Sequence, residues 1–126
     1  MKTIMIIDDS YTNLILVQSV IDDLAEGFEI VKETDSNVAI ERMQAIKPDV
    51  VILDIMMPDI DGISILRSMK ESPDLKDIPV IILSAFPGRE KEKEALKLGA
   101  SYYIRKPLVV TELVEKIQES TLHQLT

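Results

Sequence analysis

Short apolar runs alternate with amphipathic stretches along this chain of 126 residues. The apolar runs lack the period-two pattern of half-exposed strands, so they predict strands that are covered on both faces. The amphipathic stretches predict helices, and strict alternation of the two predicts an α/β fold, a doubly wound five-stranded parallel sheet with five helices on its two faces. The expected strands are residues 3–7, 28–33, 50–53, 79–83 and 101–105, and the expected helices are residues 10–24, 36–46, 62–71, 89–98 and 111–121.

The composition excludes several classes of protein. A length of 126 residues suits one domain over residues 1–126, and a hydrophobic content of 46% is enough for a packed core. No apolar run approaches the roughly 20 residues of a membrane span, and we expect neither a secretory signal nor a membrane partner. The absence of cysteine excludes disulfides and thiolate metal sites and is compatible with a cytoplasmic protein. The formal net charge of −8 makes direct binding to nucleic acid unfavourable.

Five polar residues follow the apolar runs at the points where strands are expected to end. Asp8 and Asp9 follow the first run, Asp54 the third, Ser84 the fourth and Lys106 the fifth. The carboxyl ends of parallel strands line one edge of a sheet, where ligands bind in folds of this type. In the flavodoxin-like strand order 2-1-3-4-5, which we expect here, the first and third strands are neighbours. The three carboxylates, the hydroxyl and the ammonium should therefore meet at one centre.

Three carboxylates in one place need positive charge, because like charges raise one another's pKa values. Asp8, Asp9 and Asp54 offer the oxygen ligands that a hard divalent cation such as Mg²⁺ prefers, and Lys106 adds a fixed positive charge. A simpler interpretation is that Asp8 and Asp9 cap the first helix. One aspartate would suffice for a cap, and no helix follows Asp54 directly, so we favour the metal site.

Asp54 is the best candidate for a nucleophile, since it lies near the middle of the expected edge and its carboxylate can attack phosphorus. The product would be an acyl phosphate. Phosphoryl transfer depends mainly on positioning and on neutralising the equatorial oxygens, which the cation, the Lys106 ammonium and the Ser84 hydroxyl can do. Taken alone, Ser84 would be interpreted as a turn serine and Lys106 as a solvated lysine. Only the ensemble favours the catalytic roles.

Over nearly its whole length the chain resembles the receiver domain of two-component response regulators. The resemblance depends on five short motifs in the family's order and at its spacing. They are residues 6–10 (IIDDS), 49–62 (DVVILDIMMPDIDG), 82–85 (ILSA), 95–100 (ALKLGA) and 102–107 (YYIRKP). The resemblance implies a phosphoacceptor at Asp54 that is fed by a phosphohistidine of a histidine kinase or phosphotransfer protein. Such a domain catalyses its own phosphorylation and dephosphorylation and is not a turnover enzyme.

The resemblance also implies a ligand set for Mg²⁺, for which Mn²⁺ can substitute. Asp9, Asp54 and the backbone carbonyl of Met56 would bind the cation directly, and Asp8 would act through water. Gly62 matches the family too, and it permits a tight turn into the next helix. No other cofactor is implied, since the chain has no glycine-rich phosphate loop.

Further implications concern the switch. Lys106 would contact the phosphoryl group, Ser84 would do so after activation, and the Lys106–Pro107 peptide bond would be cis. Tyr103 would fill the space that Ser84 vacates and so alter the surface of the fourth helix, fifth strand and fifth helix. Without the resemblance, we would interpret Tyr103 as a large core residue with a hydrated hydroxyl.

The first expected helix is unusually apolar and predicts a docking surface. We assign it an inward stripe at helical spacing and, beside this stripe, a more exposed face next to the active edge. Because exposed apolar patches often mark partner sites, we predict that a kinase or phosphotransfer helical bundle docks on this helix. Wider burial of the helix is the alternative. The inward stripe is Leu16, Val17, Val20, Ile21 and Leu24, and the exposed face is Tyr11, Leu14 and Ile15.

Rival functions fit less well. An aspartate-nucleophile phosphatase needs a second acid two residues after the nucleophile, where this chain has Met56. A flavin-binding domain is disfavoured because the acidic end of the first strand would repel the cofactor's phosphate. A non-phosphorylated interaction module of the same fold is the main alternative, although it should lack at least one of the five site residues. The sequence leaves open the cognate kinase, the downstream target or fused output domain, and homodimerisation on activation.

Overall fold

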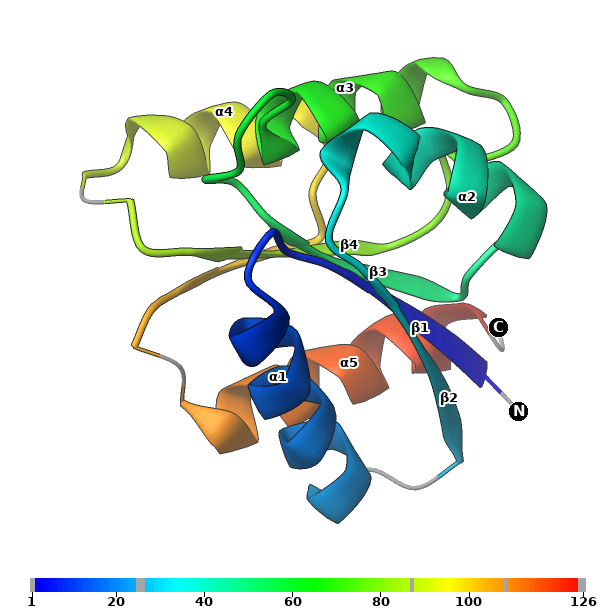
Figure 1. Ribbon diagram of the computed structural model, residues 1–126, viewed down its shortest axis with the longest axis vertical. Helices are drawn as coiled ribbons and strands as arrows, with labels where there is room; N and C mark the ends of the chain where they lie inside the picture. The colour runs from blue at the N-terminus through cyan, green and yellow to red at the C-terminus, as the bar shows by residue number, and fades with distance from the viewer. Residues whose placement is uncertain (1, 25–26, 87, 108, 125–126) are drawn as a thin grey trace.

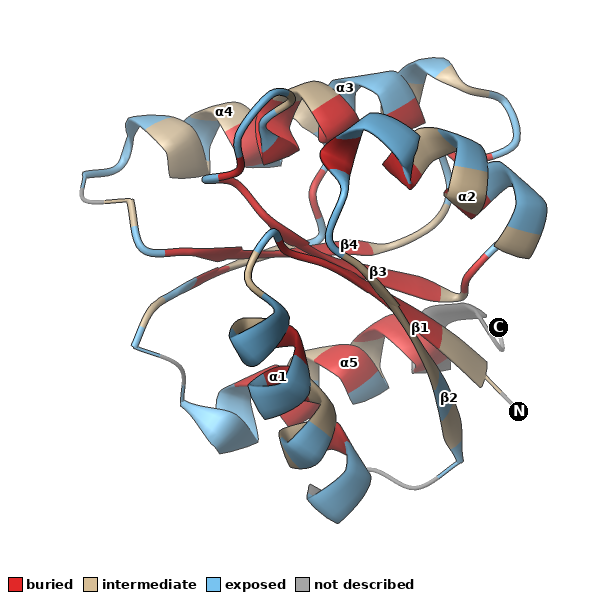
Figure 2. Cartoon of the chain, viewed as in Figure 1, coloured by how far each residue is buried: buried red, intermediate tan, exposed pale blue. Residues whose placement is uncertain are grey.

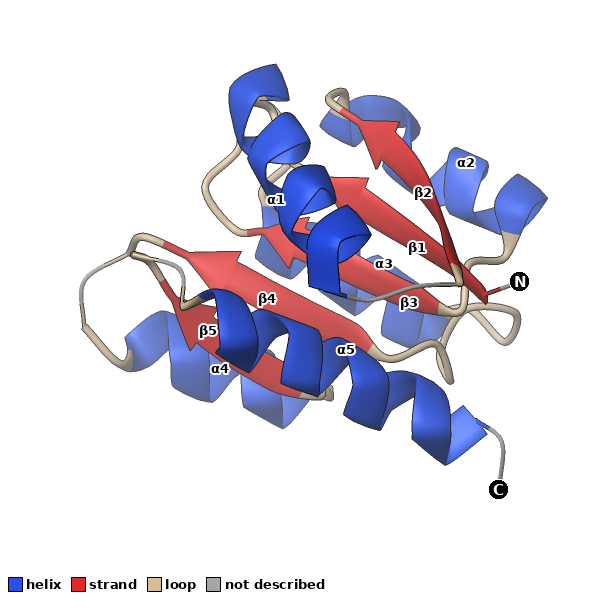
Figure 3. Cartoon of the chain, turned by 90° about the horizontal axis from the view of Figure 1, so that it is seen from below, coloured by secondary structure: helices blue, strands red, loops and turns tan. Residues whose placement is uncertain are grey.

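The computed structural model describes residues 2–24, 27–86, 88–107 and 109–124. It contains a five-stranded parallel sheet with the order β2-β1-β3-β4-β5 (Figures 1 and 3). The predicted doubly wound α/β fold and its flavodoxin-like strand order are thus confirmed. The strands are β1 (Lys2–Ile7), β2 (Phe28–Glu33), β3 (Val50–Asp54), β4 (Val80–Ser84) and β5 (Tyr102–Arg105). The helices are α1 (Tyr11–Leu24), α2 (Ala39–Ile46), α3 (Gly62–Glu71), α4 (Glu90–Leu98) and α5 (Val110–Gln124), with a short 3₁₀ helix, η1, at Ser36–Val38.

Helices cover both faces of the sheet, which explains why its central strands are continuously apolar. α1 and α5 lie on one face, and α2, α3 and α4 lie on the other (Figure 1). Successive residues of β1 therefore enter different cores. Ile4 and Ile6 pack with residues of α1 and α5, whereas Met5 and Ile7 pack with residues of α2 and α3. Burial is concentrated on the central strands β1, β3 and β4 and on the helix sides that face them (Figure 2). Among the described helices, none has the length and apolar content to cross a membrane.

Most predicted elements agree with the structure to within one residue at each end, and two differ for physical reasons. The helix expected over residues 36–46 begins as η1, which Asp35 caps by accepting a backbone hydrogen bond of 2.9 Å. The last helix continues to Gln124, past the expected end at residue 121. Ser120 near that end donates its hydroxyl to the Lys116 carbonyl at 2.8 Å. Its side chain is therefore satisfied inside the helix and does not terminate it.

The predicted assignment of faces on α1 is wrong in two positions. Leu14, expected on the exposed face, is fully buried, and Leu16, expected in the inward stripe, is 59% exposed. The buried stripe is Leu14, Val17 and Ile21, spaced i, i+3 and i+7. Apolar residues occupy so much of this helix that periodicity alone does not select the inward direction; contact with the sheet does. Of the other predicted positions, Tyr11 and Ile15 are exposed, Val20 is half-buried, and the Leu24 side chain lies outside the described residues.

Candidate functional site

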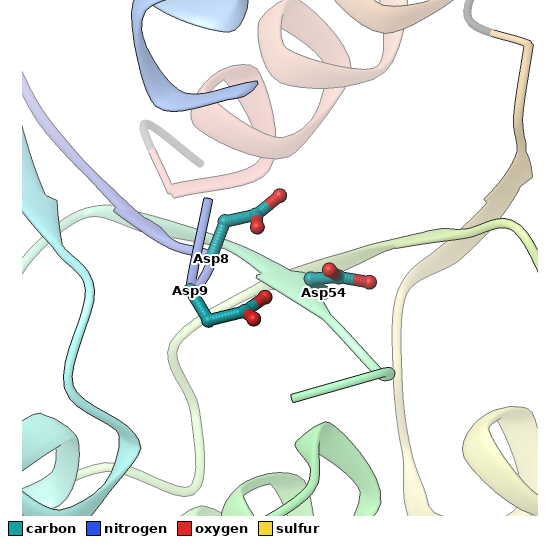
Figure 4. Close-up of side chains that lie close together, drawn as sticks. All are labelled: Asp8, Asp9 and Asp54. Carbon is teal, nitrogen blue, oxygen red and sulfur yellow. The ribbon is translucent and has the colours of Figure 1, made fainter. Parts of the chain in front are cut away.

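Asp8, Asp9 and Asp54 meet at the carboxyl-terminal edge of the sheet. β1 and β3 are paired with Ile7 opposite Leu53, so the next residues, Asp8 and Asp54, lie side by side. One carboxylate oxygen from each aspartate lies within 4.8 Å of the other two. Figure 4 shows the three side chains grouped where β1 and β3 end. Asp8 and Asp54 are buried, and Asp9 is exposed.

Lys106 brings positive charge to these acids. It follows β5 at the same edge, and its Nζ lies 3.9 Å from Asp8 Oδ2 and 3.9 Å from Asp54 Oδ2. Its backbone amide donates to the Ser84 carbonyl at 2.8 Å, which extends the β4–β5 contact beyond the strand. The Lys106–Pro107 peptide bond is cis, as the family resemblance implied. The ammonium is therefore shared between two buried carboxylates.

Burial controls the charge state of the acids. It raises the pKa of Asp54 from 3.8 to about 6, and repulsion from Asp8 adds to the rise, while Lys106 and the Met56 amide oppose it. Burial likewise raises the pKa of Asp8, against a backbone hydrogen bond from Ser10 and the attraction of Lys106. One ammonium does not offset the cost of ionising these acids. A cluster of carboxylate oxygens that needs more positive charge suits Mg²⁺.

The β3–α3 loop, residues 55–61, begins and ends beside Asp54. The Met56 amide donates to Asp54 Oδ1 at 3.2 Å, and the Gly62 amide donates to the Ile55 carbonyl at 2.9 Å. A side chain at position 62 would overlap the Asp54 carbonyl oxygen, so this close return of the chain requires glycine. Met56, whose carbonyl is the predicted third cation ligand, lies between these two fixed contacts.

Ser84 is the last residue of β4 rather than the first residue after it. Leu83 is paired with Asp54 on the neighbouring strand, so Ser84 reaches the same edge of the sheet. It is buried, and its hydroxyl oxygen accepts a hydrogen bond of 3.0 Å from the Phe86 amide. The structure therefore brings Ser84 to the site edge with its hydroxyl engaged by the β4–α4 loop.

The chain is similar over most of its length to a known family. Residues 4–118 match the response regulator receiver domain. This chain is a response regulator receiver domain. The receiver domain is 29% identical over 117 residues to the polar-differentiation response regulator DivK of Brucella anthropi, which covers 93% of this chain and 94% of DivK. It is also 30% identical over 122 residues to the response regulator PleD of Caulobacter vibrioides, where 97% of this chain matches only 26% of PleD.

A solved structure has the same architecture. The crystal structure of the signal receiver domain of a DNA-binding response regulator (merR) from Colwellia psychrerythraea 34H matches with a TM-score of 0.88. Its sequence identity is 28%, and the match covers 94% of this receiver domain and 97% of that chain. The family assignment thus holds in sequence and in three dimensions.

Tyr103 of the receiver domain lies on β5 with its hydroxyl buried. Within the described residues this oxygen has no hydrogen-bond partner, and the ring packs against the core on the α2–α4 face. The Arg105 guanidinium lies 5.8 Å from the ring centroid and donates to Glu92 Oε1 of α4 at 2.8 Å. The ring thus packs against the core as the alternative prediction expects, and its hydroxyl is buried rather than exposed at the surface. The ring sits under an ion pair that joins β5 to α4.

A cavity of about 200 Å³ opens between α1 and the end of β5. The polar residues that line it are Asp8 and Lys106, which belong to the acidic site, and Asn13 of α1. Asn13 hydrogen-bonds Asp8 and favours the charged form, which lowers the pKa of that carboxyl. Sequence reasoning missed Asn13, although its place in the first turn after Asp8 could have indicated it. The apolar wall of the cavity is Leu16, Val17, Leu83 and Pro107.

Proposed function

We propose that this receiver domain is the phosphoacceptor of a two-component system. A phosphohistidine on a histidine kinase or phosphotransfer protein would donate its phosphoryl group to Asp54. The observation that carries the proposal is the Asp54 carboxylate, buried beside Asp8 and 3.9 Å from Lys106 Nζ. A nucleophile for phosphorus needs negative charge to attack and nearby positive charge to balance the product, and this arrangement supplies both.

In the proposed reaction, a carboxylate oxygen of Asp54 forms a bond to phosphorus while the phosphorus–nitrogen bond of the donor breaks. The electron pair of that bond stays on the imidazole nitrogen, and Asp54 becomes an aspartyl phosphate. Lys106 balances charge on one phosphoryl oxygen. The Ser84 hydroxyl leaves the Phe86 amide, its present partner at 3.0 Å, and donates to another phosphoryl oxygen.

Mg²⁺ is the proposed cofactor, with Mn²⁺ as a substitute. When bound, the cation would neutralise charge on the carboxylates and on the phosphoryl group. Asp9, Asp54 and the Met56 carbonyl would hold it directly, and Asp8 would act through water. Support comes from the oxygen-only donor set and from the raised pKa of Asp54, where burial and repulsion from Asp8 outweigh the attraction of Lys106.

The proposed output passes through Tyr103 to the surface formed by α4, β5 and α5. When Ser84 moves toward the phosphoryl group, Tyr103 fills the vacated space. Within the part of the chain that the structure describes, the buried Tyr103 hydroxyl has no hydrogen-bond partner, which favours a second position in which it gains one. The reader of this surface would be a separate target, a fused output domain or a second receiver domain in a homodimer.

The proposed docking surface for the donor lies on α1. Tyr11, Ile15 and Leu16 are exposed apolar side chains there, and Leu16 also lines the cavity that Asp8 and Lys106 reach. An apolar helical bundle seated on this surface would place a phosphohistidine next to the acids. The corrected face, with Leu16 in place of Leu14, therefore supports the proposal better than the predicted one.

We further propose that the domain is not a turnover enzyme, since its product remains on its own Asp54. Its proposed location is the cytoplasm, where histidine kinases draw their phosphate from ATP. The alternative, a non-phosphorylated interaction module, is less well supported. Such a module would have no need to keep Asp54 and Lys106 in contact at a buried position.

The test uses a small phosphodonor and needs no partner protein. Wild-type protein and Asp54→Ala are incubated with acetyl phosphate or phosphoramidate in Mg²⁺, and their intact masses are compared. The wild type should gain one phosphoryl group and lose it again on standing, whereas Asp54→Ala should gain none. Equal labelling of the two proteins, or no labelling of the wild type at saturating donor, would support the interaction module instead.

A further inference from the structure

The β3–α3 loop contains a turn with unfavourable backbone geometry. Asp59 has a φ of +66°, and the Ile60 amide donates to the Pro58 carbonyl at 2.8 Å, two residues back. These are the features of a γ-turn with positive φ, a rare and strained conformation. Residues other than glycine avoid positive φ unless their surroundings enforce it. The contacts around residues 58–60 should therefore show what enforces it.

Two residues at the start of η1 hold this turn. The Ser36 hydroxyl donates to the Pro58 carbonyl at 3.0 Å and accepts from the Ile60 amide at 3.3 Å, so it bonds to both groups that close the turn. Asn37 Nδ2 donates to Asp59 Oδ2 at 3.1 Å. We call Ser36 and Asn37 the turn bracket. Each residue of the turn has a hydrogen bond to the bracket, which lies 22 to 24 residues earlier in the chain.

Capping of η1 does not account for the buried hydroxyl of Ser36. A serine at such a position often caps a helix, but here Asp35 is the cap of η1. Ser36 is only 6% exposed, and the hydrogen bonds of its hydroxyl go to the β3–α3 loop. Because the buried Ser36 hydroxyl bonds to a distant loop and not to its own helix, its hydrogen bonds stabilise the conformation of that loop.

The loop that the turn bracket contacts, the β3–α3 loop, contains Met56. Its first part is fixed by the Met56 amide on Asp54 Oδ1, and its end by the Gly62 amide on the Ile55 carbonyl. The bracket fixes the middle, two residues beyond Met56. We propose that Ser36 is a positioning residue for the cation site: it keeps the β3–α3 loop in the conformation in which the Met56 carbonyl can serve as a ligand. This inference rests on the proposed function, because the cation belongs to that proposal.

Ser36→Ala tests the inference, with Ser120→Ala as its matched control. Ser120 is also a buried serine, 2% exposed, with one hydroxyl bond, but that bond lies within α5. Titration calorimetry of the metal-free proteins with Mg²⁺ should show affinity about three- to tenfold weaker in Ser36→Ala and unchanged in Ser120→Ala. The fold-change follows from losing two hydrogen bonds that keep the binding-competent loop populated. Ser36→Thr, which keeps the hydroxyl, should retain most of the affinity.

A second readout needs no cation. In the metal-free protein, hydrogen exchange of the Ile60 amide should be about three- to tenfold faster in Ser36→Ala than in the wild type, because this amide loses one of its two acceptors. A purely structural role for Ser36 would lower the denaturation midpoint as Ser120→Ala does and leave Mg²⁺ affinity and local exchange alone. That result would overturn the inference.

Two further outcomes are distinguishable. If Ser36→Ala does not fold, Asn37→Ala removes the exposed side-chain bonds to Asp59 and to Asp35 and should weaken Mg²⁺ binding by about twofold; an unchanged affinity would overturn the inference. If the wild type itself binds no Mg²⁺, the proposed function fails and the inference fails with it. Wild-type binding with an unaltered Ser36→Ala affinity removes the inference alone.

Discussion

Lys106 Nζ and Asp54 Oδ2 lie 3.9 Å apart, an ion-pair distance that is longer than a hydrogen bond. The same nitrogen lies 3.9 Å from Asp8 Oδ2. The ammonium is thus between two acids and in hydrogen-bond contact with neither of these oxygens. It supplies charge to the site while the Asp54 oxygen stays available to an incoming group.

Replacing Lys106 should raise the pKa of Asp54 further. Lys106 is the largest influence that lowers it, so Lys106→Met should move the pKa of Asp54 above its value of about 6 in the metal-free protein. The carboxyl carbon shift of Asp54, followed by NMR over a pH titration, measures this directly. Lys116→Met on α5, which pairs with Glu119 away from the site, is the control and should leave the titration of Asp54 unchanged.

The raised pKa of Asp54 makes stability depend on pH. The native state holds the Asp54 proton more tightly than the unfolded state, so the free energy of unfolding falls as pH rises from about 4 through about 6. The interval between 3.8 and about 6, at 1.36 kcal/mol for each pH unit, corresponds to about 3 kcal/mol. Asp54→Asn cannot ionise. Without metal it should be more stable than the wild type at pH 7, by up to about 3 kcal/mol.

Urea denaturation at several pH values checks this difference. The advantage of Asp54→Asn should shrink toward zero near pH 4, where the native Asp54 is protonated. Mg²⁺ should raise the stability of the wild type at pH 7, because it binds the native state. A constant difference between the two proteins from pH 4 to pH 8 would contradict the raised pKa.

The adjacent tyrosines on β5 should differ in how loss of the hydroxyl changes protein stability. Tyr103→Phe removes a buried hydroxyl that has no hydrogen-bond partner among the described residues, and it should stabilise the unphosphorylated protein by about 1 kcal/mol. Tyr102→Phe removes a hydroxyl that donates to Glu119 Oε2 at 2.8 Å and should not stabilise it. Thermal denaturation of the two variants under one condition gives the comparison. Destabilisation by Tyr103→Phe would mean that the hydroxyl is satisfied in solution.

Substitution of Leu16 tests the proposed docking surface on α1, because this side chain is exposed and also lines the cavity beside the acids. Leu16→Glu should slow phosphorylation by the cognate kinase at least about tenfold, since it puts a charge into the apolar contact, and it should leave labelling by acetyl phosphate unchanged. Leu96→Glu on α4, another exposed leucine, is the matched control and should affect neither donor. Radiolabel transfer measures the first rate and intact mass the second. Equal loss with both donors would indicate misfolding of α1 rather than a docking defect.

The parts of the site that follow strand ends could be predicted from sequence, because the end of each apolar run is visible locally and the ends of parallel strands share one edge of the sheet. Asp8 and Asp54 follow from two apolar runs and one parallel pairing. The inward face of α1 could not be predicted, since Leu14 and Leu16 fit stripes of equal quality and only the sheet distinguishes them. Ser36 could not be predicted either. Its hydroxyl has meaning only beside Pro58, and nothing in the sequence near Ser36 indicates that contact.

The placement of helices on both faces of the sheet separates α1, the proposed donor surface, from α4, part of the proposed output surface. α1 and α4 lie on opposite faces of the sheet. A donor bound to α1, as proposed, would therefore leave α4 uncovered, although α5 lies on the same face as α1. A target that reads α4 could then bind before the donor dissociates, so the lifetime of the donor complex would place no lower limit on how soon such a target reads the signal.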